Sequence, residues 1–171
     1  LTGAMAGFAA TLGVAVALVA PSGNAAPNPL DAAALALRPS VTAAPRPDLT
    51  HPKILRVSVG GVPFPTWSQR FPWKAVGQRA DSVGGRSTLT VFYDNPAGVR
   101  LGYTIVDGKA LAWPAGTRTV VRNAVEVHVL HRGGRVMAFW REHGRSCIIS
   151  APESVPETRM IALASSTDYL A

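Results

Sequence analysis

The side chains able to perform metal, acid–base or nucleophilic chemistry are few and lie far apart in this sequence. Its histidines are His51, His128, His131 and His143, and its one cysteine is Cys147. His128 and His131 are three residues apart in a stretch typical of a β-strand, so we expect their side chains on opposite faces. Two ligands on opposite faces cannot bind one metal ion, and nothing requires His143 to approach either of them. We therefore expect no metal-binding residues and no cofactor.

The sequence does not predict a catalytic nucleophile either. His143 precedes Cys147 by four positions across an expected turn, but Cys147 lies in an apolar stretch, residues 147–149, where a thiol is usually inert. Glu126 and Glu142 are isolated carboxylates that give no acid–base pair. There is no Gly-x-Ser-x-Gly segment and no phosphate-binding glycine loop. We expect that the protein is not an enzyme and has no catalytic or cofactor-binding residues.

Cys147 is instead expected to be a core residue. Alternation along residues 145–150 places Cys147 and Ile149 on one face and Ser146 and Ile148 on the other. Large apolar side chains on both faces indicate a central strand, and burial there raises the pKa of a thiol.

The formal net charge of +7 is compatible with binding to nucleic acid or to anionic lipid. The basic residues are dispersed along the chain, however, and form no run. We expect an Arg-rich solvated surface and no nucleic-acid partner, with weak lipid contact as the second interpretation.

An apolar run occupies residues 3–20 and contains no charged side chain. A helix of this length reaches about 27 Å, close to the hydrocarbon thickness of a bilayer. We predict a transmembrane helix at residues 1–20 that contacts lipid through residues 3–20; a cleaved signal peptide and a buried soluble helix are the alternatives. No basic residue precedes the run, which favours a retained anchor. Because the sequence begins with Leu1, we expect it to be a piece of a longer chain.

The next segment, residues 21–53, is rich in Ala and Pro, and we predict a semi-extended linker with a short helix over residues 30–37. Arg38 is the one basic residue between positions 21 and 40, so the positive-inside rule places the C-terminal side outside the cytoplasm. The predicted extracytoplasmic domain covers residues 54–171. Its first part contains aromatic side chains that we expect to cap the core: Phe64, Trp67, Phe71 and Trp73.

From Ser87 onward, apolar residues recur with the period of two that is typical of strands. The predicted strands are residues 87–93, 99–106, 109–113, 118–122, 125–131, 135–141 and 145–150. Asp107-Gly108 is a strong signal for a hairpin between the second and third of these strands, and Asn123-Ala124 is a further turn.

A helix is predicted at the C-terminal end. Ser154 and Glu157 match a capping box, after which Met160, Leu163, Ala164 and Thr167 share one face. The predicted fold class is α+β: an antiparallel β-meander sheet with a C-terminal helix packed on it, preceded by an N-terminal transmembrane helix and a Pro/Ala-rich stalk.

Residues 140–150 read WREHGRSCIIS and precede a helix that contains Leu163-Ala164. This pattern resembles the end of actinobacterial single-pass transmembrane anti-sigma factors. Further similarity lies upstream, in residues 71–81, Gly85-Arg86, residues 90–93 and Gly102 to Gly108, so the resemblance covers about residues 63–167 plus the span. The chain departs from the family pattern at Pro72, where Gly is usual, and at Ser146, where Thr is usual.

The resemblance implies a cytoplasmic sigma-binding module before the span, often a small zinc-binding helical domain. That module is missing from this sequence, so no sigma-contacting or zinc-binding residue can be assigned here. The implied function is a non-enzymatic extracytoplasmic sensor or shielding domain of a membrane-anchored anti-sigma factor that regulates transcription. Its partners would be a sigma factor and a regulating protease, and its location a single pass through the cell membrane. The alternative is a membrane-anchored extracytoplasmic domain that binds an envelope polymer or a partner protein.

Overall fold

The computed structural model describes residues 26–166 of the chain. The predicted transmembrane segment, residues 1–20, and Thr167 of the predicted helix lie outside these residues. Within residues 26–166, no helix combines the length and the apolar character needed to cross a bilayer.

The chain folds mostly into antiparallel β-sheet. The larger sheet has seven strands in the order β3-β4-β5-β9-β8-β7-β6, and each neighbouring pair is antiparallel. Its strands are β3 (Lys74–Val83), β4 (Arg86–Asp94), β5 (Arg100–Val106), β6 (Arg118–Arg122), β7 (Val125–Arg132), β8 (Arg135–Glu142) and β9 (Arg145–Pro152). A second sheet pairs β1 (Ile54–Val59) with β2 (Val62–Pro65). Two meanders, β3–β5 and β6–β9, thus meet where β5 pairs with β9.

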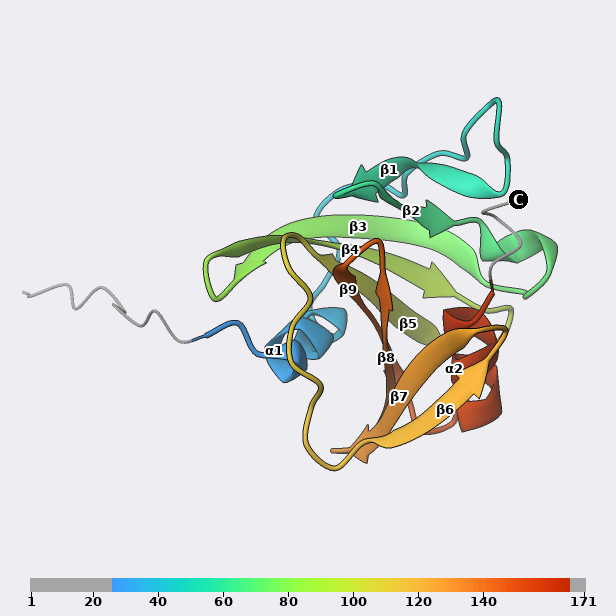
Figure 1. The fold of residues 1–171 in the computed structure, drawn as a ribbon. Coiled ribbons are helices and arrows are strands. Elements are labelled where there is room, and N and C mark those ends of the chain that lie inside the picture. Colours follow the sequence, from blue (N-terminus) through green and yellow to red (C-terminus); the bar gives the residue numbers. More distant parts are fainter. Residues whose placement is uncertain (1–25, 167–171) are drawn as a thin grey trace, which may run out of the picture.

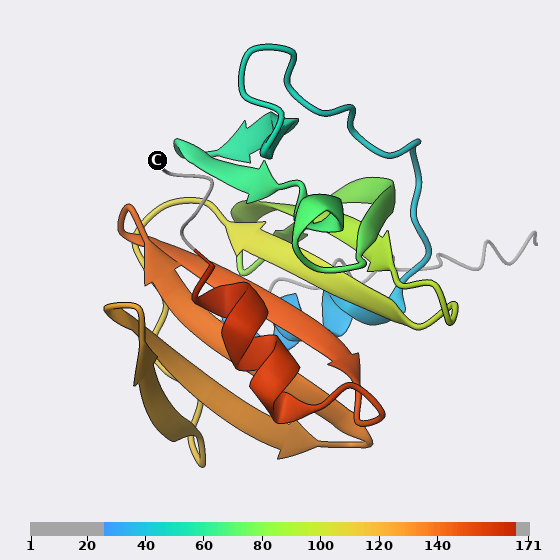
Figure 2. The same ribbon diagram turned by 90° about the vertical axis from the view of Figure 1, so that its right-hand side faces the viewer.

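Both faces of the seven-stranded sheet are covered. The short helix α1 (Pro29–Ala34) and the 3-10 turn after it (Leu35–Leu37) pack on β5 and β9. The C-terminal helix α2 (Glu157–Ala164) packs on β6, β7 and β8. Figures 1 and 2 show α1 and α2 on opposite faces of the sheet. The face under α2 also carries the small sheet, because Leu55, Val62 and Phe64 belong to the same core cluster as Met160 and Leu163.

Aromatic side chains fill the centre of this cluster. Phe64, Trp67, Phe71 and Trp73 are all buried. Tyr103 lies in the middle of the cluster, with its ring centroid 4.9 Å from that of Phe64, 5.6 Å from that of Trp67 and 5.1 Å from that of Trp140. Expected to cap the core, these aromatics are part of it. A second 3-10 turn, Trp67–Gln69, helps to place them.

Most predicted strands are confirmed, but the predicted hairpin at Asp107-Gly108 is wrong. Residues 109–113 form no strand, and the neighbour of β5 is β9, with Tyr103 opposite Ile149 and Ile105 opposite Cys147. Residues 145–150 have a large apolar side chain on each face, Ile149 on one and Ile148 on the other, and can therefore occupy the middle of the sheet, whereas residues 109–113 would place only alanines on one face. Residues 107–117 instead form a crossover loop to β6. Strand β3, the longest strand, is absent from the predictions because its side chains do not alternate in polarity.

The predicted capping box is also wrong. Helix α2 begins at Glu157, its N-cap residue is Pro156, and no side chain caps it. The proline at position 156 has an extended backbone, which places Ser154 outside the helix. Glu157 has a different use, because its carboxylate contacts Arg118 of β6 and lies 3.0 Å from Nε2 of His131.

The stalk predicted for residues 21–53 needs correction over its described part. The short helix is confirmed, but it is docked: Ala32, Ala33 and Leu35 are buried against the sheet. A Cβ atom at Gly102 would lie 2.6 Å from the Cβ of Ala36, and one at Gly77 would lie 2.5 Å from the Cβ of Ser40. The absence of side chains at these two glycines therefore lets the segment lie directly on the sheet. A composition rich in Ala and Pro suggested exposure, yet small side chains also suit close packing.

Hydrogen bonds hold the rest of this segment along β3. The main chain of Val41 and Thr42 bonds to that of Gln78, at 3.0 to 3.1 Å. Arg79 donates to the carbonyl of Pro39 at 2.6 Å and to the carboxylate of Asp81 at 2.5 Å. The Arg79 bond is the main cause that holds the pKa of Asp81 below its ordinary value.

Candidate functional site

The structure places the four histidines in different surroundings. His51 and His143 are exposed in turns. His131 faces α2 and lies 3.0 Å from a carboxylate oxygen of Glu157. His128 is on the opposite face of β7, as predicted, where only 7% of its surface is exposed. Within the described residues, no group of three His, Cys, Asp or Glu side chains has the arrangement of a metal site.

The most elaborate polar arrangement surrounds His128, where the crossover loop passes over β7 and β8. Trp113 of the loop stacks on the imidazole with ring centroids 3.9 Å apart and ring planes 16° from parallel. The guanidinium carbon of Arg141 lies 4.1 Å from the centroid of the Trp113 ring, and its Nη2 donates to the carbonyl of Leu111 at 2.9 Å. His128 of β7 and Arg141 of β8 therefore hold the loop by contacting Trp113 and the loop's main chain.

Glu126 is not the isolated carboxylate that the sequence suggested. Its Oε1 lies 2.6 Å from Nε2 of His128, because residues two apart in a strand share a face. Nδ1 of His128 lies 3.1 Å from the hydroxyl of Thr117 and 3.4 Å from that of Thr119. A pair written Glu-x-His in a strand is the sequence signal that could have identified this contact.

A hydroxyl, an imidazole and a carboxylate in this order resemble the relay of a nucleophilic hydrolase. Two contacts oppose that use. The Thr117 hydroxyl donates to the carbonyl of Pro114 at 3.2 Å, and the stacked indole covers the imidazole. The arrangement is therefore suited to fixing the loop on the sheet.

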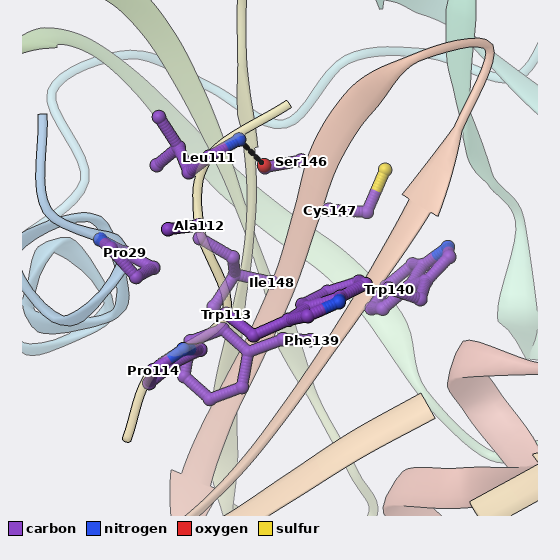
Figure 3. A pocket seen from close by; sticks show the side chains of 10 residues that line it. All are labelled: Pro29, Leu111, Ala112, Trp113, Pro114, Phe139, Trp140, Ser146, Cys147 and Ile148. Carbon is purple, nitrogen blue, oxygen red and sulfur yellow. Dashed lines mark hydrogen bonds between the residues drawn. The ribbon is translucent and has the colours of Figure 1, made fainter. Parts of the chain in front are cut away.

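Beside the stacked rings of Trp113 and His128 lies an open hollow of about 380 Å³. It is lined by Trp113, Ala124, Val125, Glu126 and Arg141. A hollow lined by an aromatic ring together with an acidic and a basic side chain could hold a small polar ligand. A second cavity lies beneath the loop, where Leu111, Trp113 and Pro114 face Phe139 and Ile148 (Figure 3). Its volume of about 10 Å³ leaves space for no more than one water molecule. The loop is thus packed closely on the sheet, and the Leu111 N–H donates to the Ser146 hydroxyl at 2.8 Å.

Cys147 is a core residue, as the sequence predicts. It is fully buried together with Ile149, on the face opposite Ile148, and burial raises the pKa of its thiol far above the ordinary value. Arg145 does not change this, because its guanidinium reaches Asp107 at 3.3 Å. The thiol is therefore unsuited to nucleophilic or redox chemistry in the folded protein.

Comparison with known protein families, with characterised proteins and with solved structures finds no match for this chain.

Proposed function

We propose that the chain comprises the membrane span and the extracytoplasmic domain of an anti-sigma factor. In this proposal the folded part has no enzymatic activity, and it senses a signal or shields the segment near the membrane from proteolysis. Its supports are the resemblance in residues 63–167 and the positions of the residues that carry it. Trp73, Trp140 and Cys147 lie in one buried cluster, and Gly77 and Gly102 lie where the N-terminal segment approaches the sheet. The similar pattern therefore coincides with what the packing of this fold requires.

The observation that carries the proposal is the docking of α1. The apolar run ends at Ala20, and α1 begins at Pro29 with its buried face on β5 and β9. A segment that links a membrane span to a sheet can report on that sheet, because release of α1 changes what lies next to the membrane. A sensor requires such a connection, whereas a simple spacer does not.

Two neighbouring alanines allow a matched test of this connection. Ala33 is buried and Ala34 is exposed, so Ala33→Asp places a charge against the sheet while Ala34→Asp adds the same charge to the solvent face. In the full-length protein, we expect Ala33→Asp to change sigma-dependent transcription and cleavage near the membrane. Ala34→Asp is expected to behave as the wild type. Equal behaviour of the two variants would contradict the sensing role.

A pull-down from the native host tests the identity itself. The full-length membrane protein is expected to recover a sigma factor, and protease added outside intact cells is expected to remove the folded domain. Recovery of no sigma factor, under conditions where the protein is intact, would count against the proposal.

The second candidate function is a membrane-anchored domain that binds an envelope polymer or a partner protein. The hollow beside Trp113 favours it, because Glu126 and Arg141 carry opposite charges and line the hollow together with this aromatic ring. Co-sedimentation with purified cell wall distinguishes the two, and binding that Arg141→Ala abolishes would favour this candidate.

A further inference from the structure

The two edges of the seven-stranded sheet are treated differently. At the β3 edge, an extended piece of the same chain adds to the sheet: Thr42 pairs with Gln78, and their N–H and C=O groups exchange hydrogen bonds of 3.1 Å. At the other edge, β6 pairs with β7 alone among the described residues. One edge of this sheet therefore accepts an extended segment, and the opposite edge pairs with no further strand within residues 26–166.

The turn between β6 and β7 determines which groups of β6 are available. Asn123 and Ala124 both have positive φ, 50° and 60°, and form a two-residue turn between Arg122 and Val125. In such a hairpin the pair next to the turn is hydrogen-bonded, and alternate pairs follow it. Arg118, Val120 and Arg122 consequently bond to β7. The N–H and C=O groups of Thr119 and Val121 point outward.

The side chains of β6 restrict the partner. Val121 is 69% exposed, on the face that carries Trp113. Arg118 and Arg122 lie on the other face, four residues apart, on either side of Val120, which packs against the core. Arg118 contacts Glu157, yet 61% of its side chain remains exposed. The open edge thus presents two cations around an apolar residue.

This arrangement disfavours a second copy of the chain. Full antiparallel pairing of β6 with itself about Val120 would place Arg118 opposite the Arg122 of the other copy, at both ends of the strand. Like charges directly opposite each other destabilise a strand pair. A strand with carboxylates at those two positions would instead be stabilised by both pairs.

We infer that the β6 edge binds an extended segment of another protein whose sequence reads acidic–x–apolar–x–acidic. The carboxylates pair with Arg118 and Arg122, the apolar residue extends the core beside Val120, and the main chain bonds to Thr119 and Val121. This inference goes beyond the proposed function and does not depend on it. If the peptides fail to bind, the result of the sigma-factor pull-down is unaffected. If the pull-down recovers no sigma factor, the peptide measurement still tests the β6 edge.

The test uses the full chain in a non-ionic detergent and three capped peptides. The first has Glu on both sides of a central Thr-Val-Thr, the second has Lys at the same two places, and the third is a scrambled form of the first. We expect the Glu peptide to bind at least about fivefold more tightly than the Lys peptide at low salt, because two cross-strand charge pairs change sign. In hydrogen exchange, protection should appear at the amides of Thr119 and Val121.

Two variants identify the surface. Arg122→Glu leaves one favourable and one unfavourable charge pair with either peptide, so it should abolish the preference for the Glu peptide, while Arg56→Glu makes the same charge change at an exposed position of β1 and should leave the preference intact. Val121→Pro removes an outward N–H and should abolish binding, with the circular dichroism spectrum showing that the fold persists. Equal binding of all three peptides, protection outside β6, or self-association of the chain through β6 would overturn the inference.

Discussion

Trp113 and His128 stack with their ring centroids 3.9 Å apart, although one belongs to the crossover loop and the other to β7. The loop carries the chain from the middle of the sheet to its edge, and the stack fixes the loop's path over β8 and β7. Arg141 adds a cation over the same indole ring. The bond from the Leu111 N–H to the Ser146 hydroxyl also holds the loop.

Removal of the indole is therefore expected to loosen the loop. Trp113→Ala should lower the free energy of unfolding by about 2–4 kcal/mol. This loss is smaller than the one expected at a fully buried tryptophan, because Trp113 is half-buried. Trp113→Phe keeps a ring on His128 and should recover most of the loss. Urea denaturation measures both variants, and limited proteolysis should cut within residues 107–117 first in the alanine variant. Equal stability of the two variants would show that the stack does not hold the loop.

The positive φ of Ala124 predicts a stabilising substitution. Alanine at φ 60° carries steric strain that glycine lacks, so Ala124→Gly should raise the free energy of unfolding by about 0.5–1 kcal/mol. Ala97 lies in another turn without a positive φ, so Ala97→Gly should be neutral or destabilising. Thermal denaturation of the two variants gives the comparison. A loss of stability in Ala124→Gly would mean that the turn is not strained.

Gly102 and Ala36 are expected to be coupled. A Cβ at position 102 would lie 2.6 Å from the Cβ of Ala36, so Gly102→Ala should push α1 and the turn after it away from the sheet. We expect a loss of about 1–3 kcal/mol. Ala36→Gly in the same chain should restore part of it, which gives a coupling energy in a double-mutant cycle. Additive losses would indicate that Gly102→Ala acts through the strand alone.

Burial of Cys147 makes stability depend on pH in the alkaline range. The folded thiol has a raised pKa, so above the unfolded value of about 8.5 the unfolded chain releases a proton that the folded chain retains. Stability should therefore fall as pH rises above about 8.5, with a slope from this group that approaches about 1.4 kcal/mol per pH unit. Cys147→Ala should remove that part of the slope, at a cost in packing at every pH. A maleimide should label the thiol only with denaturant present, and rapid labelling of the folded protein would contradict the buried position.

By itself, the sequence determined the local structure of the C-terminal half. Alternating polarity and short turn signals locate β4 to β9 within a few residues, and apolar side chains on both faces of residues 145–150 identify a central strand with Cys147 in the core. These properties depend on neighbours in the chain, which alternation and turn residues report directly.

Only the tertiary structure decided which strands are adjacent and which polar groups meet. The turn preference of Asp107-Gly108 was overridden because β9 has large apolar side chains on both of its faces and can lie beside β5 in the middle of the sheet, whereas residues 109–113 lack such side chains on one face. Docking of α1 depends on matching Gly102 with Ala36, which are 66 positions apart, and the site at His128 depends on a tryptophan that reaches it from the crossover loop. Such contacts join residues that are far apart in the sequence and whose local patterns are independent. Complementary shape and burial determine these contacts, so no local sequence pattern predicts them.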